Sequence, residues 1–191
     1  MAAWDNYNRC FRARQEATPT DEASPTTPAA SPGITITDLA QFAPTPRPLS
    51  TEPDAVGVAG LPVNFTASAA RHVQSGTLLG TALTVRFTPV AYDYDYGDGS
   101  SRTLTTPGRT WADLGQEPFT PTPTSHTYAA AGTYTVRLSI RYAAEIDTGT
   151  GWTPVAGTLT SAPPPLILTI HTARTALVAH TCTERPTAPG C

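Results

Sequence analysis

Three closely spaced aspartates are the residues of this sequence best suited to metal chemistry. Asp93, Asp95 and Asp98 lie in the stretch from Tyr92 to Gly99. Carboxylate oxygens are the ligands that Ca²⁺ prefers, and the spacing is superficially that of a calcium loop. An EF-hand also needs an oxygen ligand at its fifth position and a glutamate at its twelfth, where this chain has glycine and leucine. An EF-hand is therefore excluded, and a simpler calcium site made by two or three of these carboxylates stays open.

The alternative is that Asp95 and Asp98 hold a tight turn. Aspartate side chains accept hydrogen bonds from nearby backbone N–H groups, and the neighbouring Gly97 and Gly99 tolerate positive φ angles. Turn geometry alone explains both residue types, so this interpretation is favoured. The sequence accordingly predicts no cofactor, with calcium as the one open alternative.

The remaining ionisable residues match no catalytic motif. His72, His171 and His180 lack neighbours at metal-ligand spacing, and H-E-x-x-H, G-x-S-x-G, P-loop and G-x-G-x-x-G patterns are all missing from the sequence. A glycosidase would need two carboxylates flanking a cleft, and nothing in the sequence indicates such a pair. Since activity must be argued from a site, we predict that this protein is not an enzyme.

Alternating strands must position the aspartates. From Tyr92 to Tyr96 the residues alternate strictly, so the tyrosines share one face of an extended strand and the aspartates share the other. The clearest strand runs from Thr133 to Tyr142, where strict alternation indicates one buried face and one wet face. Similar segments separated by turn residues bring the expected total to seven to nine antiparallel strands, an all-β fold.

The segments on either side of these strands are predicted to have a less regular structure. Ile34 to Thr37 has the pattern of a short strand, and Asp38 then caps a turn of helix. The prolines between Pro44 and Pro53 predict an extended connector. At the other end, the run Pro163–Pro165 precedes a last strand from Leu166 to Thr172, and a continuation of this strand to Val178 stays open.

Two motifs together resemble the PKD (polycystic kidney disease-type) domain family. One is an aromatic-Asp-aromatic-Gly-Asp-Gly turn, and the other is a His-Thr-Tyr element followed by Gly-x-Tyr-x-Val-x-Leu. The residues that carry them are Tyr94, Asp95, Tyr96, Gly97, Asp98, Gly99, His126, Tyr128, Gly132 and Tyr134. The resemblance covers roughly residues 60–142 and implies an immunoglobulin-like β-sandwich. It also implies an interaction or spacer role in surface and secreted proteins.

One position tests this resemblance at residue level. Antibody domains have a corner tyrosine two residues before the second core cysteine. Tyr134 lies two residues before Val136, so the corner can form here without the disulfide. Tyr94 stands where the family more often has tryptophan.

The aromatic residues outside these strands are the candidate partner-binding residues. Trp111 and Phe119 lie in the long stretch Ser100–Ser125, and loops of that length without structure are uncommon and often functional. Trp152 follows the glycine-rich turn of a predicted hairpin. Trp111 and Trp152 could stack on sugars, but packing as lids over the open end of the sandwich explains them at least as well.

The three cysteines lie near the two ends of the chain. Cys10, Cys182 and Cys191 include no C-x-x-C spacing, which argues against a zinc site. Cys10 could pair with Cys182 or Cys191 if the ends of the sandwich meet. One disulfide is favoured over three free thiols, because the resembled family is extracellular.

Composition limits partners and location. The net charge is −3 and no run of Lys or Arg exists, so nucleic acid is not an expected partner. The longest aliphatic run is Leu166–Leu168, far short of a transmembrane segment. Residues 1–7 do not have the form of a signal peptide. The family resemblance nevertheless implies an extracellular or cell-surface location, and a processed chain, a misplaced start or another export route would each reconcile the two.

The chain is expected to divide into four parts. Residues 1–33 form a tail and a disordered Pro/Thr-rich linker, and residues 34–54 form the short strand, helical turn and connector. Residues 55–180 form the PKD-like β-sandwich, and residues 181–191 form a C-terminal tail.

Three functions are compatible with these features. The first is a non-catalytic, extracytoplasmic module for surface display or protein–protein interaction, with a protein or polysaccharide partner at the cell surface. The second is a carbohydrate-binding accessory module that uses Trp111 and Trp152. The third is a structural subunit of a larger surface or phage assembly, with strands near Pro163–Pro165 as contact edges and an oligomeric state that the sequence leaves open.

Overall fold

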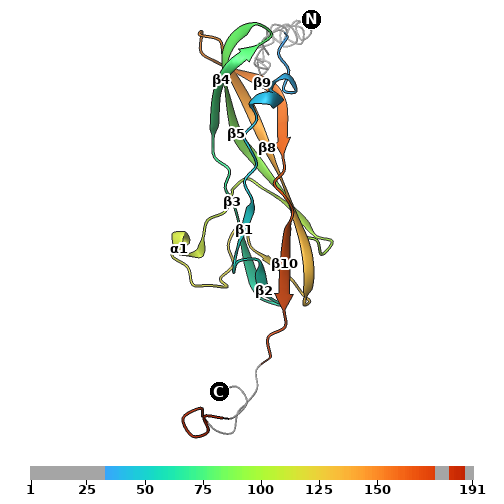
Figure 1. Ribbon diagram of the computed structural model, residues 1–191, viewed down its shortest axis with the longest axis vertical. Helices are drawn as coiled ribbons and strands as arrows, with labels where there is room; N and C mark the ends of the chain where they lie inside the picture. The colour runs from blue at the N-terminus through green and yellow to red at the C-terminus, as the bar shows by residue number, and fades with distance from the viewer. Residues whose placement is uncertain (1–32, 175–180, 188–191) are drawn as a thin grey trace, which may run out of the picture.

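The computed structural model describes residues 33–174 and 181–187 of the 191-residue chain. The structure is elongated and consists mostly of strands, the longest of which follow the long axis (Figure 1). In chain order the elements are η1 (Asp38–Phe42), β1 (Leu49–Glu52), β2 (Val56–Val58), β3 (Pro62–Ala67), β4 (His72–Leu78), β5 (Thr81–Asp95), β6 (Ser101–Leu104), α1 (Trp111–Leu114), β7 (His126–Thr127), β8 (Gly132–Asp147), β9 (Trp152–Ser161) and β10 (Leu166–His171).

The strands form two sheets. The smaller has the order β1-β3-β7, and the larger has the order β2-β10-β8-β5-β4, with β6 also paired to β5 and β9 also paired to β8. The predicted all-β, immunoglobulin-like sandwich is confirmed. The described residues contain ten strands where seven to nine were expected, since β1, β6 and β7 are too short for alternation to reveal them. One pair, β10 with β2, is parallel, and the others are antiparallel.

The antiparallel pair of β5 and β8 is the backbone of the larger sheet. β5 is continuous for 15 residues although it contains Pro89. Its register against β8 shifts between Pro89 and Ala91. Proline has no N–H to donate, so a bulge is the place where a sheet interior accommodates it.

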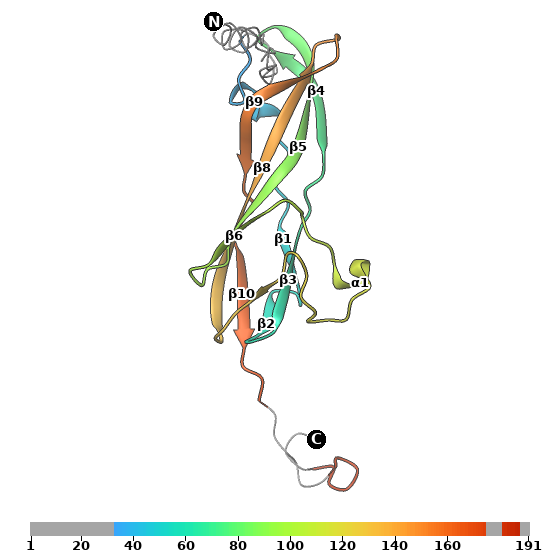
Figure 2. The same ribbon diagram turned by 180° about the vertical axis from the view of Figure 1, so that it is seen from behind.

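Two strands share one side of β8 in succession. β9 pairs with the second half of β8, where Ser161 lies opposite Ile140, and β10 pairs with its first half, where Leu166 lies opposite Val136. The chain passes from one to the other through the predicted proline break at Pro163–Pro165, so β9 and β10 continue in the same direction (Figures 1 and 2).

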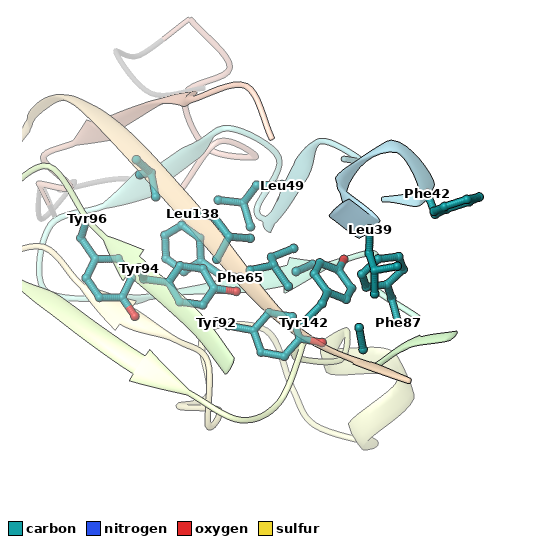
Figure 3. Packing of buried hydrophobic residues seen from close by; sticks show 14 of the residues in the cluster. Leu39, Phe42, Leu49, Phe65, Phe87, Tyr92, Tyr94, Tyr96, Leu138 and Tyr142 are labelled. Carbon is teal, nitrogen blue, oxygen red and sulfur yellow. The ribbon is translucent and has the colours of Figure 1, made fainter. Parts of the chain in front are cut away.

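Aromatic side chains fill the core in a row that follows the long axis. Tyr96 and Tyr94 lie at one end of this row and Phe87 lies at the other (Figure 3). Tyr92, Tyr94 and Tyr96 are each at most 2% exposed, whereas Asp95, on the opposite face of β5, is exposed, as the alternation predicted.

The end of the larger sheet that carries β4 and β9 is covered by η1. Leu39 is fully buried in the shared core, and the Phe42 ring lies against β4. A Cβ atom added to Gly76 would come within 2.5 Å of the Phe42 ring, so the glycine makes room for this contact. The N-terminal helical turn is therefore part of the core.

Two predictions about the flanking segments are wrong. Ile34 to Thr37 is a turn and not a strand: the Asp38 N–H donates to the Thr35 carbonyl, and the Asp38 carboxylate accepts from the Thr35 N–H at 2.8 Å. The expected connector contains β1, which pairs with β3 and so belongs to the sandwich. The predicted last strand is present as β10, which starts at Leu166 as expected and ends at His171, one residue before the predicted end.

The predicted chain divisions remain predictions, apart from the place of β1 in the sandwich. The expected disordered linker falls almost wholly outside the described residues, as does Val178.

Candidate functional site

The aspartate turn follows directly on β5. The Tyr96 N–H donates to the Ser100 carbonyl at 3.1 Å and closes the turn. Within it, Asp95 accepts from the Gly97 N–H and Asp98 accepts from the Ser100 N–H, each at 3.0 Å. These are the backbone hydrogen bonds of the turn-holding interpretation.

Asp98 also joins this turn to β7. Its Oδ2 lies 2.7 Å from Nε2 of His126, and its Oδ1 accepts from the Ser100 hydroxyl at 2.5 Å. Burial alone would raise the pKa of Asp98, but the hydrogen bonds from Ser100 and His126 outweigh it and lower the pKa to about 2. Asp98 is therefore held as a carboxylate at any pH near neutrality.

The other two aspartates form ion pairs with β8. The Arg141 guanidinium contacts both carboxylate oxygens of Asp93, at 2.8 and 3.2 Å, and the Thr103 hydroxyl donates to the same carboxylate at 2.6 Å. These bonds lower the pKa of Asp93. Arg137 lies 3.7 Å from Asp95 in a more exposed pair. Each of the three aspartates is thus paired with another side chain of this protein.

The three carboxylates do not form a ready metal site. Across residues 33–174 and 181–187, no group of three or more His, Cys, Asp or Glu side chains is placed to hold a metal ion. The geometry therefore gives calcium binding at Asp93, Asp95 and Asp98 no support, and it stays a prediction to be tested in solution.

The two motifs of the PKD resemblance meet as one aromatic cluster. The His126 ring stacks on the Tyr96 ring at a centroid distance of 4.0 Å, and the Tyr128 ring meets His126 edge-on at 4.7 Å. The Tyr128 hydroxyl donates to the Tyr96 carbonyl at 3.1 Å. Since β7 belongs to the smaller sheet and β5 to the larger, this cluster connects the two sheets.

Tyr134 forms the corner expected of it. Its hydroxyl donates to the Ala130 carbonyl at 2.9 Å, a few residues upstream in the chain, and its ring lies 4.4 Å from that of Tyr128. Val136, two residues on, is fully buried where antibody domains have a cysteine. The corner exists here beside an apolar core position in place of a disulfide.

Gly97 fits the turn for two reasons. Its φ of +79° lies in the left-handed region, and an added Cβ would come within 2.6 Å of the Thr135 carbonyl oxygen on β8. The first glycine of the motif is therefore a point of close backbone approach between the turn and the neighbouring strand.

Two tyrosine hydroxyls in the core lack a hydrogen-bond partner. Within the described part of the chain, the hydroxyl oxygens of Tyr94 and Tyr96 are buried and make no hydrogen bond, and the two rings stack at 5.7 Å. A buried polar group without a partner costs free energy. Burial also raises the pKa of Tyr94.

A buried asparagine organises the long loop after β6. The strand pattern gave no reason to single this residue out. Asn64 is fully buried on β3, and its Nδ2 donates to Glu52 at 2.7 Å and to the Arg109 carbonyl at 2.8 Å. Its Oδ1 accepts from the Thr122 and Thr124 hydroxyls at 2.6 and 3.2 Å. Asn64 also begins an Asn-Phe-Thr sequence, which has the form of a glycosylation acceptor, but its amide is buried and so is not accessible for glycosylation.

The same network positions Trp111. The Glu52 carboxylate accepts from the Trp111 N–H at 2.8 Å, and the indole N–H donates to the Thr120 carbonyl at 2.8 Å. The Trp111 side chain is 5% exposed and contacts the Phe119 ring at 5.6 Å. The Trp111 ring thus packs inside the loop, which gives a stacking role no support and agrees with the alternative that the residue packs against the protein.

Trp152 lies elsewhere and is half-exposed. It begins β9, at the end of the molecule that carries β4, whereas α1 projects from the side of the other half (Figures 1 and 2). The Arg86 guanidinium sits 4.1 Å from its ring centre and also pairs with Glu145 at 2.7 Å. The two tryptophans thus do not form a common platform.

The cysteines fall mainly outside the described residues. Cys182 takes part in a disulfide, and Cys10 and Cys191 lie outside the described ranges, so the predicted pairing stays a prediction. Among the described elements, no helix has the length and apolar character needed to cross a bilayer.

Comparison with known proteins agrees with this geometry. No curated protein matches the chain. The sequence model of the PKD domain matches residues 48–145, which include β1, both motifs and most of β8. This match is wider than the resemblance seen in the sequence, and it covers the clustered residues of the aspartate turn and β7. The chain belongs to the PKD domain family.

Proposed function

We propose that this chain is a non-catalytic, extracytoplasmic module that displays its neighbouring segments at a surface and makes contacts with other proteins. PKD domains are generally non-catalytic immunoglobulin-like modules, often found in protein and surface interactions, and they are typically extracellular. The proposal extends these family properties to this chain.

The observation that carries the proposal is the path of the chain through the sandwich. The segment around η1 lies at the end of the long axis that carries β4 and β9, and β10 ends at the opposite end (Figures 1 and 2). The long β5–β8 pair connects the two ends as a continuous antiparallel ladder. Flanking segments are therefore held apart along a rod, which suits a spacer or display role.

The faces of the sandwich fit a role in protein binding better than a role in catalysis. The solvent-facing side of the β5–β8 pair carries the ion pairs Asp93–Arg141 and Arg86–Glu145. In each pair the two charges bind each other and hold the strands together. Stacking on carbohydrate by a pair of tryptophans loses its basis, since Trp111 is buried. A protein partner fits these features better than a stacked sugar chain.

Labelling of the cells that make the protein tests its location. An antibody raised against the folded protein should bind intact cells or the culture medium, with a cytoplasmic protein as the internal control. Signal that appears only after the cells are permeabilised would contradict the extracytoplasmic part of the proposal.

A second candidate function, a subunit of a larger assembly, is favoured by one edge of β10. Ile167 is 54% exposed, and β2 pairs only with Thr169 to His171, so Leu166–Leu168 has an edge without a strand partner among the described residues. Exposed strand edges with apolar side chains are sites of strand addition. Oligomers seen by sedimentation that vanish in Ile167→Asp would support this function, and a monomer at all concentrations would remove it.

A further inference from the structure

A groove of about 760 Å³ opens between the connector that leads into β1 and the segment that joins β3 to β4. Its floor includes Tyr142 of β8, which belongs to the other sheet. The residues that line it are Pro44, Thr45, Arg47, Ala67, Ser68, Ala69, Ala70, Arg71, His72 and Tyr142. None of them belongs to the aspartate turn or to the aromatic cluster.

The sheet topology explains why the groove exists. Strands β1 and β3 pair as far as Leu49 opposite Ala67, and beyond that point neither segment has a strand partner. The connector, residues 43–48, contains three prolines without N–H groups, so it cannot continue the ladder. The two segments separate and leave the floor on β8 uncovered at this place.

The groove is positively charged. Arg47 and Arg71 line it, and no acidic residue is among the lining residues. Neither arginine has a carboxylate within 4.0 Å in the described part of the chain, whereas Arg86, Arg137 and Arg141 each do. The charge of Arg71 contributes to lowering the pKa of Glu145, but the Glu145 carboxylate is paired with Arg86. Two guanidinium groups therefore remain for an anion from outside.

The other lining groups suit a hydroxylated ligand. Thr45, Ser68, His72 and Tyr142 bring hydrogen-bonding side chains, and the rest are small apolar residues. Large exposed aromatic or aliphatic anchors, on which protein interfaces depend, are missing from the lining, since Tyr142 is only 4% exposed. The volume falls within the range of about 300–1,000 Å³ that is typical of small-molecule sites.

We propose that this groove binds an acidic saccharide, whose carboxylate or sulfate group is held by Arg47 and Arg71. The proposal goes beyond the display role and does not depend on it. A carboxylate on a uronic acid and a sulfate ester both offer a pair of anionic oxygen acceptors to a guanidinium group, so the two sources are distinguished by experiment.

The test is calorimetric titration of the full chain with four probes. They are a trigalacturonate, its uncharged methyl ester, a sulfated disaccharide and hexaglutamate. We expect one or both acidic sugars to bind, and to bind more weakly as salt is added. The methyl ester should bind at least about tenfold more weakly than the uronate if the uronate is the ligand, because the charge-assisted bonds are lost.

Variants then assign the binding to the groove. Arg47→Gln and Arg71→Gln should each lower the affinity by about tenfold, the loss expected for a charge-assisted hydrogen bond. Arg174→Gln is the matched control, because Arg174 is exposed and follows β10 in the chain, and β10 ends at the opposite end of the molecule from β4 (Figure 1). Thermal unfolding of each variant checks that the sandwich is intact.

Four results would overturn the proposal. The first is that neither acidic sugar binds at millimolar concentration, and the second is that the ester binds as tightly as the uronate while the sulfated sugar does not bind. The third is that Arg174→Gln lowers the affinity as much as Arg47→Gln and Arg71→Gln do. The fourth is that hexaglutamate binds at least as tightly as the sugars. The last result would assign the groove to an acidic peptide. The cell-labelling experiment is independent, so failure of one proposal leaves the other standing.

Discussion

Nε2 of His126 lies 2.7 Å from Oδ2 of Asp98, although 28 residues separate them in the chain. Asp98 follows β5 of the larger sheet, and His126 begins β7 of the smaller one. The pair therefore connects the two sheets at the place where the two motifs of the family meet, and the stacked rings of Tyr96 and His126 exclude water from one side of it.

Acid should weaken this connection over a defined range. The folded-state pKa of Asp98 is about 2, below its ordinary value of 3.8, so its stabilisation is present above pH 4 and is lost as the pH falls towards 2. Asp98→Asn should be less stable by about 1–2 kcal/mol at pH 6, and its deficit should shrink between pH 4 and pH 2.

Urea unfolding of both proteins at several pH values measures this effect. The pKa of Asp93 is also lowered, so the comparison must be the difference between wild type and variant, not the slope of either alone. Asp54→Asn is a suitable control, because Asp54 is exposed and makes no hydrogen bond within the described residues. A deficit that stays constant with pH would refute the role assigned to Asp98.

The unpaired core hydroxyls predict an unusual response to a small deletion. Tyr94→Phe removes a buried oxygen that has no partner, so it should leave stability unchanged or raise it by up to about 1–2 kcal/mol. Tyr128→Phe removes a hydroxyl that donates to the Tyr96 carbonyl and should cost about 1 kcal/mol. The comparison is made by chemical denaturation of the two variants. A clear loss of stability in Tyr94→Phe would mean that its hydroxyl has a partner in solution.

The two glycines of the turn should respond differently to alanine. Both have positive φ, but an added Cβ at Gly97 would meet the backbone of Thr135, whereas Gly99 faces open space. Gly99→Ala should cost about 1–2 kcal/mol through backbone strain alone. Gly97→Ala should cost more, on the order of 3 kcal/mol, because the turn must move away from β8. Equal losses in melting experiments would show that the close approach is not maintained.

Asn64 should control the order of the loop that carries α1. Asn64→Ala removes four hydrogen bonds and leaves the half-buried Glu52 carboxylate with fewer donors, so we expect a loss of stability of about 2–4 kcal/mol. Limited proteolysis should then cleave between residues 105 and 125 faster than elsewhere. Glu117→Gln, an exposed change in the same loop, is the control. Unchanged cleavage in Asn64→Ala would contradict the role of Asn64 as the anchor of the loop.

Local patterns predicted the parts of this fold that are determined within one strand. The alternation from Tyr92 to Tyr96 placed the tyrosines in the core and the aspartates outside, and the proline run correctly marked the change from β9 to β10. The short strand β1 was missed because its four residues are flanked by prolines, and only its pairing with β3 makes it a strand.

The site was less predictable because its contacts are long-range. The sequence left open whether Trp111 stacks on sugars or packs against the protein, and a hydrogen bond to Glu52, 59 residues earlier, fixes the loop that buries it. Nothing in the sequence around Asn64 distinguishes a buried residue that binds several segments from an ordinary polar strand residue. The groove likewise arises from two segments that separate beyond a strand pair, which no single stretch of sequence reveals.

The most direct test of the structural role assigned to the aspartate turn is thermal unfolding in calcium and in chelator, on protein of known thiol content. Asp93, Asp95 and Asp98 are each engaged by a side chain of the protein itself, so we expect the same midpoint in both conditions. A midpoint that rises with calcium, and that no longer rises in Asp98→Asn, would show that these carboxylates bind the metal and would contradict the account.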